Sequence, residues 1–303
     1  MTEPVLLYGR PPPALFPDPE GAVQASPMEP GGIDLAEPPA CMFASALILA
    51  PPGRLERDWV LARALQLLPP GGKLLALAPN DRGGPRIAPT LRSFGCVVTD
   101  DPRRRHRICS TVRPLRPTGL DEALEAGGAR FDQQLRLWTQ PGVFSWDRLD
   151  PGTALLLESI PPLEGRGADL GCGLGILALH VLKAPGVESI ELWDIDRRAV
   201  QCARRNVADR RASFHHGDLR RHDGPGGDLD FVVMNPAFHE GGREDRALGA
   251  AFIAAAARRL RRGGVCWLTA NRHLPYEAPL ALAFSEVQLR AEGAGFKVYE
   301  AVK

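Results

Sequence analysis

Short apolar runs alternate with stretches of helical periodicity in the first part of the chain. Residues 46–50 form an apolar run that predicts a buried strand. Residues 55–68 carry apolar side chains at helical spacing and end at two prolines and two glycines, which predicts a helix. A strand at 73–78, a helix at 86–94 and a strand at 96–99 are expected to follow. Strands that alternate with helices in this way predict a parallel, doubly wound sheet.

The alternation returns after residue 131, so the pattern predicts a second domain, for which 303 residues are enough. Residues 100–130, rich in arginine and then glycine, are interpreted as a linker region, and the Pro- and Gly-rich residues 1–40 predict loops with short strands at most. The elements expected in the second domain are a helix capped by Asp150, strands at 168–170, 189–196, 212–215, 229–234 and 265–270, a helix at 245–262, a loop at 271–277 and a hairpin of 286–291 with 296–302.

The stretch from Asp169 to Gly175 lies where a strand is expected to pass into a helix. Its glycines at alternate positions, 171, 173 and 175, allow a tight turn and let the backbone approach a ligand closely. The spacing differs from the dinucleotide pattern, whose second gap is two residues. Asp169 disfavours a phosphate, because like charges repel, and suits a ligand with a cationic amine. The first domain has Pro51-Pro52-Gly53 after its first predicted strand, and therefore lacks such a loop.

Acidic residues end the next two expected strands. Asp194 can accept hydrogen bonds from ribose hydroxyls, whereas Asp196 is better placed to cap the helix at 197–208. Asp218 is placed to accept from the amino group of an adenine. Each acid alone would be interpreted as a cap or turn residue. Their order at successive strand ends favours contact with a ligand.

Asn235-Pro236 ends the apolar run 229–234, because proline cannot donate to a ladder and asparagine favours turns. The Asn235 side-chain oxygen and the Pro236 carbonyl can each accept one N–H, and Phe238 can stack on a flat ring. This group of residues suits a planar molecule with an exocyclic amine. Taken alone, the same residues could be a strand followed by a turn, and the glycine-rich stretch upstream favours the ligand.

Charge and cysteine content narrow the remaining possibilities. The formal net charge is +1, so the chain as a whole is not a polycation, but residues 103–107 form an Arg-rich run suited to binding phosphates. The six cysteines have no metal-ligand spacing, which predicts reduced thiols, no zinc and a reducing cytosol. Neither a signal peptide nor a membrane span is expected.

These motifs, in this order, resemble the class I S-adenosylmethionine-dependent methyltransferases that modify exocyclic amines. Three segments are similar in more detail to the bacterial ribosomal RNA guanine-N2 methyltransferases of the small-subunit methyltransferase C type. They are Phe144-Ser145 with Leu149-Asp150-x-Gly152-x-x-Leu155-Leu156, Asn235-Pro236-x-Phe238-His239-x-Gly241, and Ala270-Asn271-Arg272-His273-Leu274-x-Tyr276. The resemblance is strong over 140–303 and weak over 45–115. The family usually has a second proline where this chain has Ala237, which leaves the loop less rigid.

The resemblance implies an α/β fold with two Rossmann-like methyltransferase domains in tandem. Residues 1–125 would form a degenerate methyltransferase-like domain that serves RNA docking and stability. Residues 126–303 would form the catalytic domain, a seven-stranded, mostly parallel sheet with a terminal antiparallel hairpin. The implied reaction transfers a methyl group from S-adenosyl-L-methionine to the exocyclic N2 amine of a guanosine in ribosomal RNA of the small subunit.

The resemblance also implies the site residues and the partners. The expected catalytic residues are Asn235, Pro236 and Phe238. The expected cofactor-binding residues are Asp169, Gly171, Cys172, Gly173, Gly175, Asp194, Ile195, Asp218, Leu219 and Asn235. Contacts to RNA are expected from His239, Arg272, Tyr276, Arg103, Arg104 and Arg105. The expected partner of this cytoplasmic monomer is ribosomal RNA or the small ribosomal subunit, with no metal and no membrane.

Two other functions fit the same residues. An N5-glutamine or adenine-N6 methyltransferase would use the same Asn-Pro grip on a planar amine. A catalytically inactive RNA-binding or ribosome assembly factor of this fold is the alternative from another class, and Ala237 is the feature that favours it.

Overall fold

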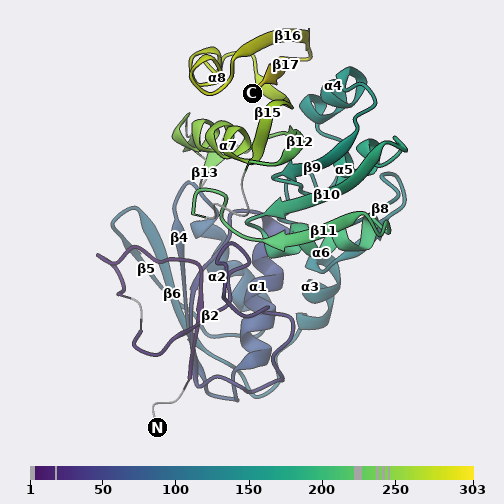
Figure 1. Cartoon of the computed structure of the whole chain (residues 1–303). Helices are drawn as coiled ribbons and strands as arrows, with labels where there is room; N and C mark the ends of the chain where they lie inside the picture. The colour runs from purple at the N-terminus through teal and green to yellow at the C-terminus, as the bar shows by residue number, and fades with distance from the viewer. Residues whose placement is uncertain (1–3, 18, 222–226, 237–238, 241–242, 245) are drawn as a thin grey trace. The chain divides into compact units, whose positions relative to one another are not determined.

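The computed structural model describes residues 4–17, 19–221, 227–236, 239–240, 243–244 and 246–303 of the chain. The chain divides into two compact units. The first comprises Met1–Ala129 with Gln140–Gly142, and the second comprises Arg130–Thr139 with Val143–Lys303. Each unit has a sheet and a hydrophobic core of its own (Figure 1).

A six-stranded sheet with the order β2-β1-β3-β4-β6-β5 forms the first unit. Its strands are β1 (Val5–Tyr8), β2 (Val23–Gln24), β3 (Ser45–Leu49), β4 (Lys73–Pro79), β5 (Thr99–Arg103) and β6 (His106–Val112), and its helices are α1 (Arg54–Leu67), α2 (Gly84–Ser93) and α3 (Leu120–Gly127). The first four strands are parallel, and β6 runs antiparallel to β4 and β5. The elements predicted between residues 46 and 94 are therefore confirmed, because their buried apolar residues give a clear pattern.

Two predictions for the first unit are wrong. Residues 96–98 are not a strand, and residues 100–130 are not a linker, since they hold most of the β5–β6 hairpin and α3. β5 is an exposed edge strand with the sequence Thr-Asp-Asp-Pro-Arg, so no apolar alternation reveals it. Arg104 and Arg105 form the hairpin turn with φ angles of 47° and 63°, a conformation that is uncommon for residues other than glycine.

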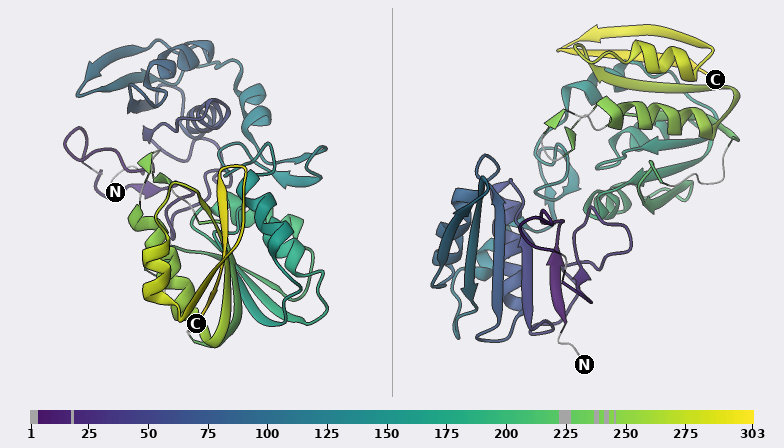
Figure 2. Two further views of the ribbon diagram at one scale, coloured as in Figure 1. Left: turned by 90° about the horizontal axis from the view of Figure 1, so that it is seen from above. Right: turned by 90° about the vertical axis from the view of Figure 1, so that its left-hand side faces the viewer.

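The second unit contains a seven-stranded sheet with the order β11-β10-β9-β12-β15-β17-β16, which confirms the predicted α/β fold with a terminal hairpin. Its strands are β9 (Gly165–Leu170), β10 (Val187–Asp194), β11 (Ala212–His216), β12 (Leu229–Met234), β15 (Leu260–Asn271), β16 (Glu286–Gly293) and β17 (Phe296–Val302). The first five strands are parallel, and β16 and β17 form the antiparallel edge, drawn in yellow in Figure 2. Two short hairpins, β7 (Arg130–Asp132) with β8 (Leu137–Thr139) and β13 (His239–Glu240) with β14 (Arg243–Glu244), complete the strands.

Helices cover both faces of this sheet. On one face α4 (Pro151–Ser159), α5 (Ile176–Val181) and α6 (Arg197–Asn206) contribute to a core that includes Leu156, Leu177 and Ala203. On the other face α7 (Arg246–Arg259) and α8 (Glu277–Ala283) contribute to a second core. Strand β9 lies between β10 and β12, so the carboxyl ends of these three parallel strands meet at one edge. That edge is where open α/β sheets bind ligands.

The helix predicted over 245–262 ends three residues early, at Arg259, and β15 already begins at Leu260. The pairing of β15 with β12 shifts between Leu260 and Val265, which accommodates the two glycines that were expected to end the helix. Helix α8 was missed, because the sequence was interpreted as a polar loop up to Glu277 and no element was predicted between there and the hairpin. Within the described part of the chain, no helix has the length and apolar character needed to cross a bilayer.

Candidate active site

A pocket lies at the carboxyl ends of β9 and β12 in the second unit. Its lining includes Phe144, Thr153, Gly173, Leu177 and Asn235. Three separate parts of the sequence therefore meet here: the segment that leads into α4, the glycine loop that leads into α5, and the residue that follows β12. The glycine loop and Asn235 were predicted to share a site, and the pocket brings them together.

Asn235 is held by the N-terminus of α4. Its Nδ2 donates to Asp150 Oδ2 at 2.9 Å and to Thr153 Oγ1 at 2.8 Å. The same Asp150 Oδ2 accepts from the backbone N–H of Thr153 at 2.8 Å, which confirms Asp150 as the N-cap of α4. One carboxylate oxygen therefore caps the helix and positions the side chain of Asn235.

This contact fixes which way the Asn235 amide faces. A carboxylate oxygen can only accept hydrogen bonds, so the amide group next to Asp150 must be the NH2. The amide oxygen Oδ1 then lies on the other side of the group, and none of the described residues donates to it. Asn235 lines the pocket, so among the described residues its amide oxygen is the side-chain group that these contacts leave for a ligand.

The glycine loop is fastened to the end of β10. The backbone N–H groups of Gly171 and Cys172 donate to the Trp193 carbonyl, and the Gly173 N–H donates to Asp194 Oδ2 at 2.9 Å. Gly173 has a φ of 51°, and a Cβ placed on it would meet no atom within 4 Å. The loop therefore borders open space, in which a ligand can approach its backbone closely.

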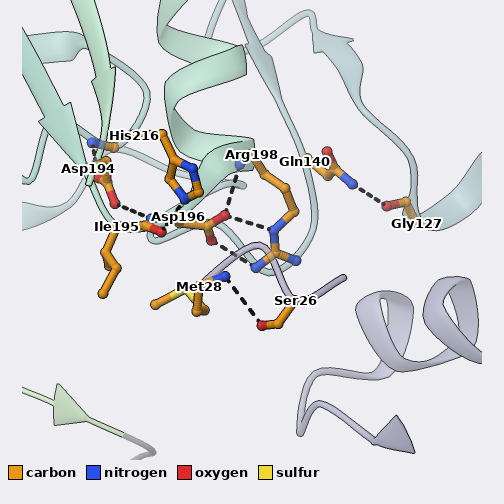
Figure 3. A network of polar contacts seen from close by, with 10 residues as sticks. Ser26, Met28, Gly127, Gln140, Asp194, Ile195, Asp196, Arg198 and His216 are labelled. Atoms are coloured by element: carbon orange, nitrogen blue, oxygen red, sulfur yellow. Dashed lines mark hydrogen bonds and ion pairs between the residues drawn. The ribbon is translucent and has the colours of Figure 1, made fainter. Parts of the chain in front are cut away.

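Asp194 and Asp196 make different contacts, and the prediction that Asp196 caps α6 is confirmed. Asp196 caps α6 through the Arg198 N–H and forms an ion pair of 2.8 Å with the Arg198 guanidinium (Figure 3). Asp194 accepts from the N–H groups of Gly173 and Asp196. Burial raises the pKa of Asp194 to about 6, although these N–H donors favour its charged form. An acid at this position favours a ligand that carries donors or positive charge.

Asp169 is fully buried beneath the glycine loop. Its Oδ2 accepts from the Ala178 N–H at 3.2 Å, and its Oδ1 has no hydrogen-bond partner among the described residues. Burial, with a smaller contribution from the Asp194 charge, raises the pKa of Asp169 to about 8. Asp169 is not among the residues that line the pocket, so its expected preference for a cationic ligand over a phosphate stays a prediction.

Of the predicted cofactor residues, four line the pocket, namely Gly171, Cys172, Gly173 and Asn235, whereas Asp169, Gly175, Asp194, Ile195, Asp218 and Leu219 do not. Asp218 is bonded to Arg220, whose Nε lies 2.9 Å from Asp218 Oδ1. Burial raises the pKa of Asp218, but the hydrogen bonds from Arg220 lower it, and the net shift of the pKa is downward. Leu219 is buried, and the Ile195 carbonyl contacts His216 Nε2 at 2.9 Å. In the part of the chain that is described, no three His, Cys, Asp or Glu side chains gather as a metal site would require.

The predicted substrate-binding residues are placed less uniformly. Phe238 and Ala237 lie outside the described residues, and of His239 only its backbone position in β13 is described. Tyr276 is 2% exposed in the core, and a Cβ on Gly249 of α7 would overlap its hydroxyl, so we assign it to packing instead of substrate binding. Arg272 is exposed and forms an ion pair with Glu292. The run Arg103–Arg105 belongs to the first unit, where it is exposed at the β5–β6 turn.

Two features of the pocket were not predicted from sequence. Thr153 was not considered, and Asp150 was interpreted only as a cap. Phe144, which is 63% exposed, and Ser145 also line the pocket, although they were noted only within a motif. The signal that could have identified Asp150 and Thr153 is their position at a helix N-terminus that follows this exposed aromatic segment.

A seven-stranded sheet of this order, with a glycine loop after β9 and Asn-Pro after β12, defines a class I methyltransferase. The family model described as the methyltransferase small domain matches residues 134–300, more than half of the chain. A ribosomal RNA small subunit methyltransferase C from Hahella chejuensis is 38% identical over 278 residues, which cover 89% of this chain and 80% of the relative. Its counterpart from Pseudomonas entomophila is 32% identical over 276 residues, with 88% and 81% covered.

The chain belongs to the ribosomal RNA small subunit methyltransferase C family, and it is an enzyme that uses S-adenosylmethionine. Its fold is shared with a solved structure of the T. thermophilus 16S rRNA N2 G1207 methyltransferase in complex with AdoMet and guanosine. That likeness has a TM-score of 0.77 at 23% identity, and it covers 100% of this chain and 88% of the other.

Proposed function

We propose that this enzyme transfers a methyl group from S-adenosylmethionine to the exocyclic N2 amine of a guanosine in small-subunit ribosomal RNA. The observation that carries the proposal is the orientation of Asn235. Asp150 and Thr153 bind its amide nitrogen, which leaves Oδ1 as an acceptor in the pocket beside the glycine loop. An acceptor fixed in this way suits an amine N–H and does not suit a substrate oxygen.

The residues around the glycine loop fit the cofactor. The open backbone at Gly173 and the acids Asp169 and Asp194 would hold a ligand with a cationic amine and ribose hydroxyls. When bound, S-adenosylmethionine supplies an electrophilic methyl group. We further propose that Asp218, Leu219 and Ile195 surround the adenine and ribose, in which case Asp218 must share or release Arg220.

The protein's contribution to the reaction is to orient the amine. The guanine N2 lone pair is delocalised into the ring and is therefore a weak nucleophile. Asn235 Oδ1 and the Pro236 carbonyl would accept hydrogen bonds from its two N–H groups. This arrangement favours a pyramidal nitrogen, whose lone pair is less delocalised into the ring and therefore more nucleophilic. The same acceptors stabilise the positive charge that develops on N2. The methylated amine is strongly acidic at that stage, so its proton can leave without a strong base.

We propose that Phe238, the aromatic residue after Asn235-Pro236, holds the target base after it has left its stack. His239 and Arg272 are proposed to contact RNA near the base. The first unit would contribute docking and stability, with Arg103, Arg104 and Arg105 as its phosphate-binding residues. The enzyme would act as a monomer in the cytoplasm, where ribosomal RNA is found.

An assay of methyl transfer with product identification tests the proposal. The full-length enzyme is incubated with labelled S-adenosylmethionine and small-subunit ribosomal RNA or particles from cells that lack the gene. The RNA is then digested to nucleosides and separated. The expected product is N2-methylguanosine at one position. Labelled N6-methyladenosine, or label only in protein, would replace the proposal by an adenine-N6 or N5-glutamine methyltransferase.

An inactive RNA-binding factor is the remaining alternative. It predicts measurable affinity for the cofactor together with no transfer to any ribosomal substrate. The Asn235→Ala variant is the matched control in the same assay, because it removes only the proposed acceptor. Equal rates of transfer by the wild type and the variant would show that the methylated amine is not held by Asn235.

A further inference from the structure

A surface of arginine and aromatic side chains lies next to the pocket in the second unit. We define it by Phe131, Trp138, Arg204 and Arg205, and we call it the arginine–aromatic surface. The Arg205 guanidinium lies 4.6 Å from the centre of the Trp138 ring, and that of Arg204, its neighbour on α6, lies 5.5 Å from the centre of the Phe214 ring. Phe131 packs edge-on against Trp138 and is 43% exposed.

The surface is fastened to the pocket. Asn206, the last residue of α6, accepts from the backbone N–H of Trp138 at 2.6 Å and donates to the carbonyls of Trp138 and Leu174. Leu174 belongs to the glycine loop and lines the pocket. A ligand that leaves the pocket past Leu174 would therefore meet Trp138 and the arginine–aromatic surface.

Positive charge dominates this surface. Arg204 and Arg205 are exposed on α6, and Arg136 is exposed just before β8. Asp132 follows Phe131 in the chain, and Asp147 lies in the segment that leads into α4. Asp132 Oδ1 accepts from backbone N–H groups of its own turn, and Asp147 pairs with Arg148 at 3.3 Å. The excess of arginine favours a polyanionic partner.

The aromatic rings indicate which polyanion. Bases of single-stranded nucleic acid stack on aromatic rings and on guanidinium planes, while arginines contact their phosphates. An acidic protein segment would match the charge but would make no use of the exposed Phe131 ring. Single-stranded RNA uses both features. The arginine–aromatic surface also adjoins the pocket in which the target base would react.

We infer that the arginine–aromatic surface binds the single-stranded RNA that flanks the target guanosine. This inference rests on the proposed function of the pocket. It assigns part of RNA recognition to the catalytic unit, in addition to the proposed docking run in the first unit. Arg204 and Arg205 would contact phosphates, and Phe131 would stack on a flanking base.

The test measures RNA binding and turnover with full-length variants. Arg204→Gln with Arg205→Gln should raise the Michaelis constant for RNA and reduce the slope of log affinity against log salt by about 0.7 for each phosphate that is no longer bound. Phe131→Ala should weaken RNA binding about five- to a hundredfold with little change in the salt slope. Neither change should alter turnover at saturating RNA or the affinity for S-adenosylmethionine.

A matched control removes the same charge elsewhere. Arg290 also lies over a tryptophan, at 5.7 Å from the Trp267 ring, and Arg262 is exposed. The double variant Arg262→Gln with Arg290→Gln should therefore bind RNA as the wild type does. Equal loss of RNA binding in this control would overturn the inference, because it would reveal a general charge effect.

Two further outcomes separate the inference from the proposed function. The Arg204/Arg205 and Phe131 variants could show wild-type RNA affinity, wild-type salt slope and intact methyl transfer. The surface would then have only a structural role, and the proposed function would be unaffected. A wild type that methylates no guanosine would overturn the proposed function. In that case RNA binding still tests the surface, because the affinity for RNA can be compared in the Asn235→Ala background between proteins with and without the surface changes.

Discussion

A single carboxylate oxygen determines the chemistry that Asn235 can perform. An asparagine amide can present either a donor or an acceptor, and in many sites both orientations are possible. Here the acceptor-only Asp150 and the hydroxyl of Thr153 both lie on the nitrogen side of the amide. The orientation is therefore built into the fold and does not have to be selected when a substrate binds. Such preorganisation is a main source of catalytic power, because no reorganisation is needed during the reaction.

Replacement of Asn235 by alanine should reduce methyl transfer strongly and leave cofactor binding nearly unchanged. The loss of one preorganised acceptor at a site of developing charge typically costs about a hundredfold to a thousandfold in turnover. Single-turnover transfer of labelled methyl at saturating cofactor measures the rate, and calorimetry measures the cofactor affinity. If calorimetry showed a comparable loss of cofactor affinity, the main role of Asn235 would be to bind the cofactor and not to orient the amine.

The two buried acids of the glycine loop predict an unusual dependence of stability on pH. In an unfolded chain an aspartate has a pKa of about 3.9, whereas burial raises the pKa of Asp169 to about 8 and that of Asp194 to about 6. The folded protein therefore binds more protons than the unfolded chain between about pH 4 and pH 8. The contribution of these groups to the free energy of unfolding is fully present at low pH and is lost as the pH rises through this window.

Asp169→Asn should remove much of this loss, because the amide does not ionise. The measurement is the Tm of the cofactor-free protein between pH 5 and pH 9, where the wild type should lose more stability than the variant. Asp209→Asn is the control, since hydrogen bonds from Arg211 hold the pKa of Asp209 to about 2 and the residue does not titrate in this range. The Asp169 variant should also bind S-adenosylmethionine more weakly. Parallel curves for the wild type and Asp169→Asn would show that Asp169 is already ionised at pH 5.

At the scale of elements, helix α4 has two functions at its first turn. Asp150 satisfies the Thr153 N–H, one of the free donors at a helix start, and it also holds Asn235. The Thr153 side chain contributes only to the second of these functions. The stability of the helix and the orientation of the catalytic amide can therefore be separated by mutation.

Asp150→Ala should lower both stability and activity, whereas Thr153→Val should lower activity alone. Loss of an N-cap costs about 0.5–2 kcal/mol of stability, and loss of one neutral hydrogen bond about 0.5–1.5 kcal/mol, or roughly two- to twelvefold in turnover. Thermal unfolding and kcat at saturating substrates are the two measurements. Thr153→Ser keeps the hydroxyl and should restore turnover. A Thr153→Ser variant as slow as Thr153→Val would mean that the methyl group, through packing, is what matters.

Elements with a clear apolar pattern or a local turn signal could be predicted from the sequence, and elements without either could not. The run 229–234 and the glycine loop were recognised because their signals are local. The edge strand β5 has no apolar pattern, and its turn uses arginines at positive φ where glycine would be expected. The contact between Asp150 and Asn235 joins positions 85 residues apart. It depends on the order of strands in the sheet, which the sequence pattern alone does not determine.

At the scale of the whole molecule, the two units share an α/β architecture but differ in a loop that joins a strand of the sheet to the helix that follows it. In the first unit, β3 passes into α1 through Pro51-Pro52-Gly53, and Gly53 has an ordinary φ of −64°. In the second unit, β9 passes into α5 through three glycines at positive φ. The first unit also holds the exposed run Arg103–Arg105. We therefore expect cofactor binding to belong to the second unit alone and the first unit to bind RNA.

Charge reversal of Arg103, Arg104 and Arg105 to glutamate in the full-length enzyme should weaken RNA binding and leave the chemical step unchanged. The three side chains are exposed at the β5–β6 turn, and Arg104 Nη1 donates to the Ala14 carbonyl at 3.0 Å. The dependence of log affinity on log salt should flatten by about 0.7 to 0.9 for each phosphate that these arginines no longer bind. The Michaelis constant for RNA should rise, while turnover at saturating RNA and the calorimetric affinity for S-adenosylmethionine should match the wild type.

A triple reversal at Arg86, Arg92 and Arg116, which are exposed in the same unit, controls for net charge. A salt slope that changes equally in both triple variants would make Arg103–Arg105 an ordinary solvated turn, and the arginine–aromatic surface would then be the remaining candidate for RNA docking.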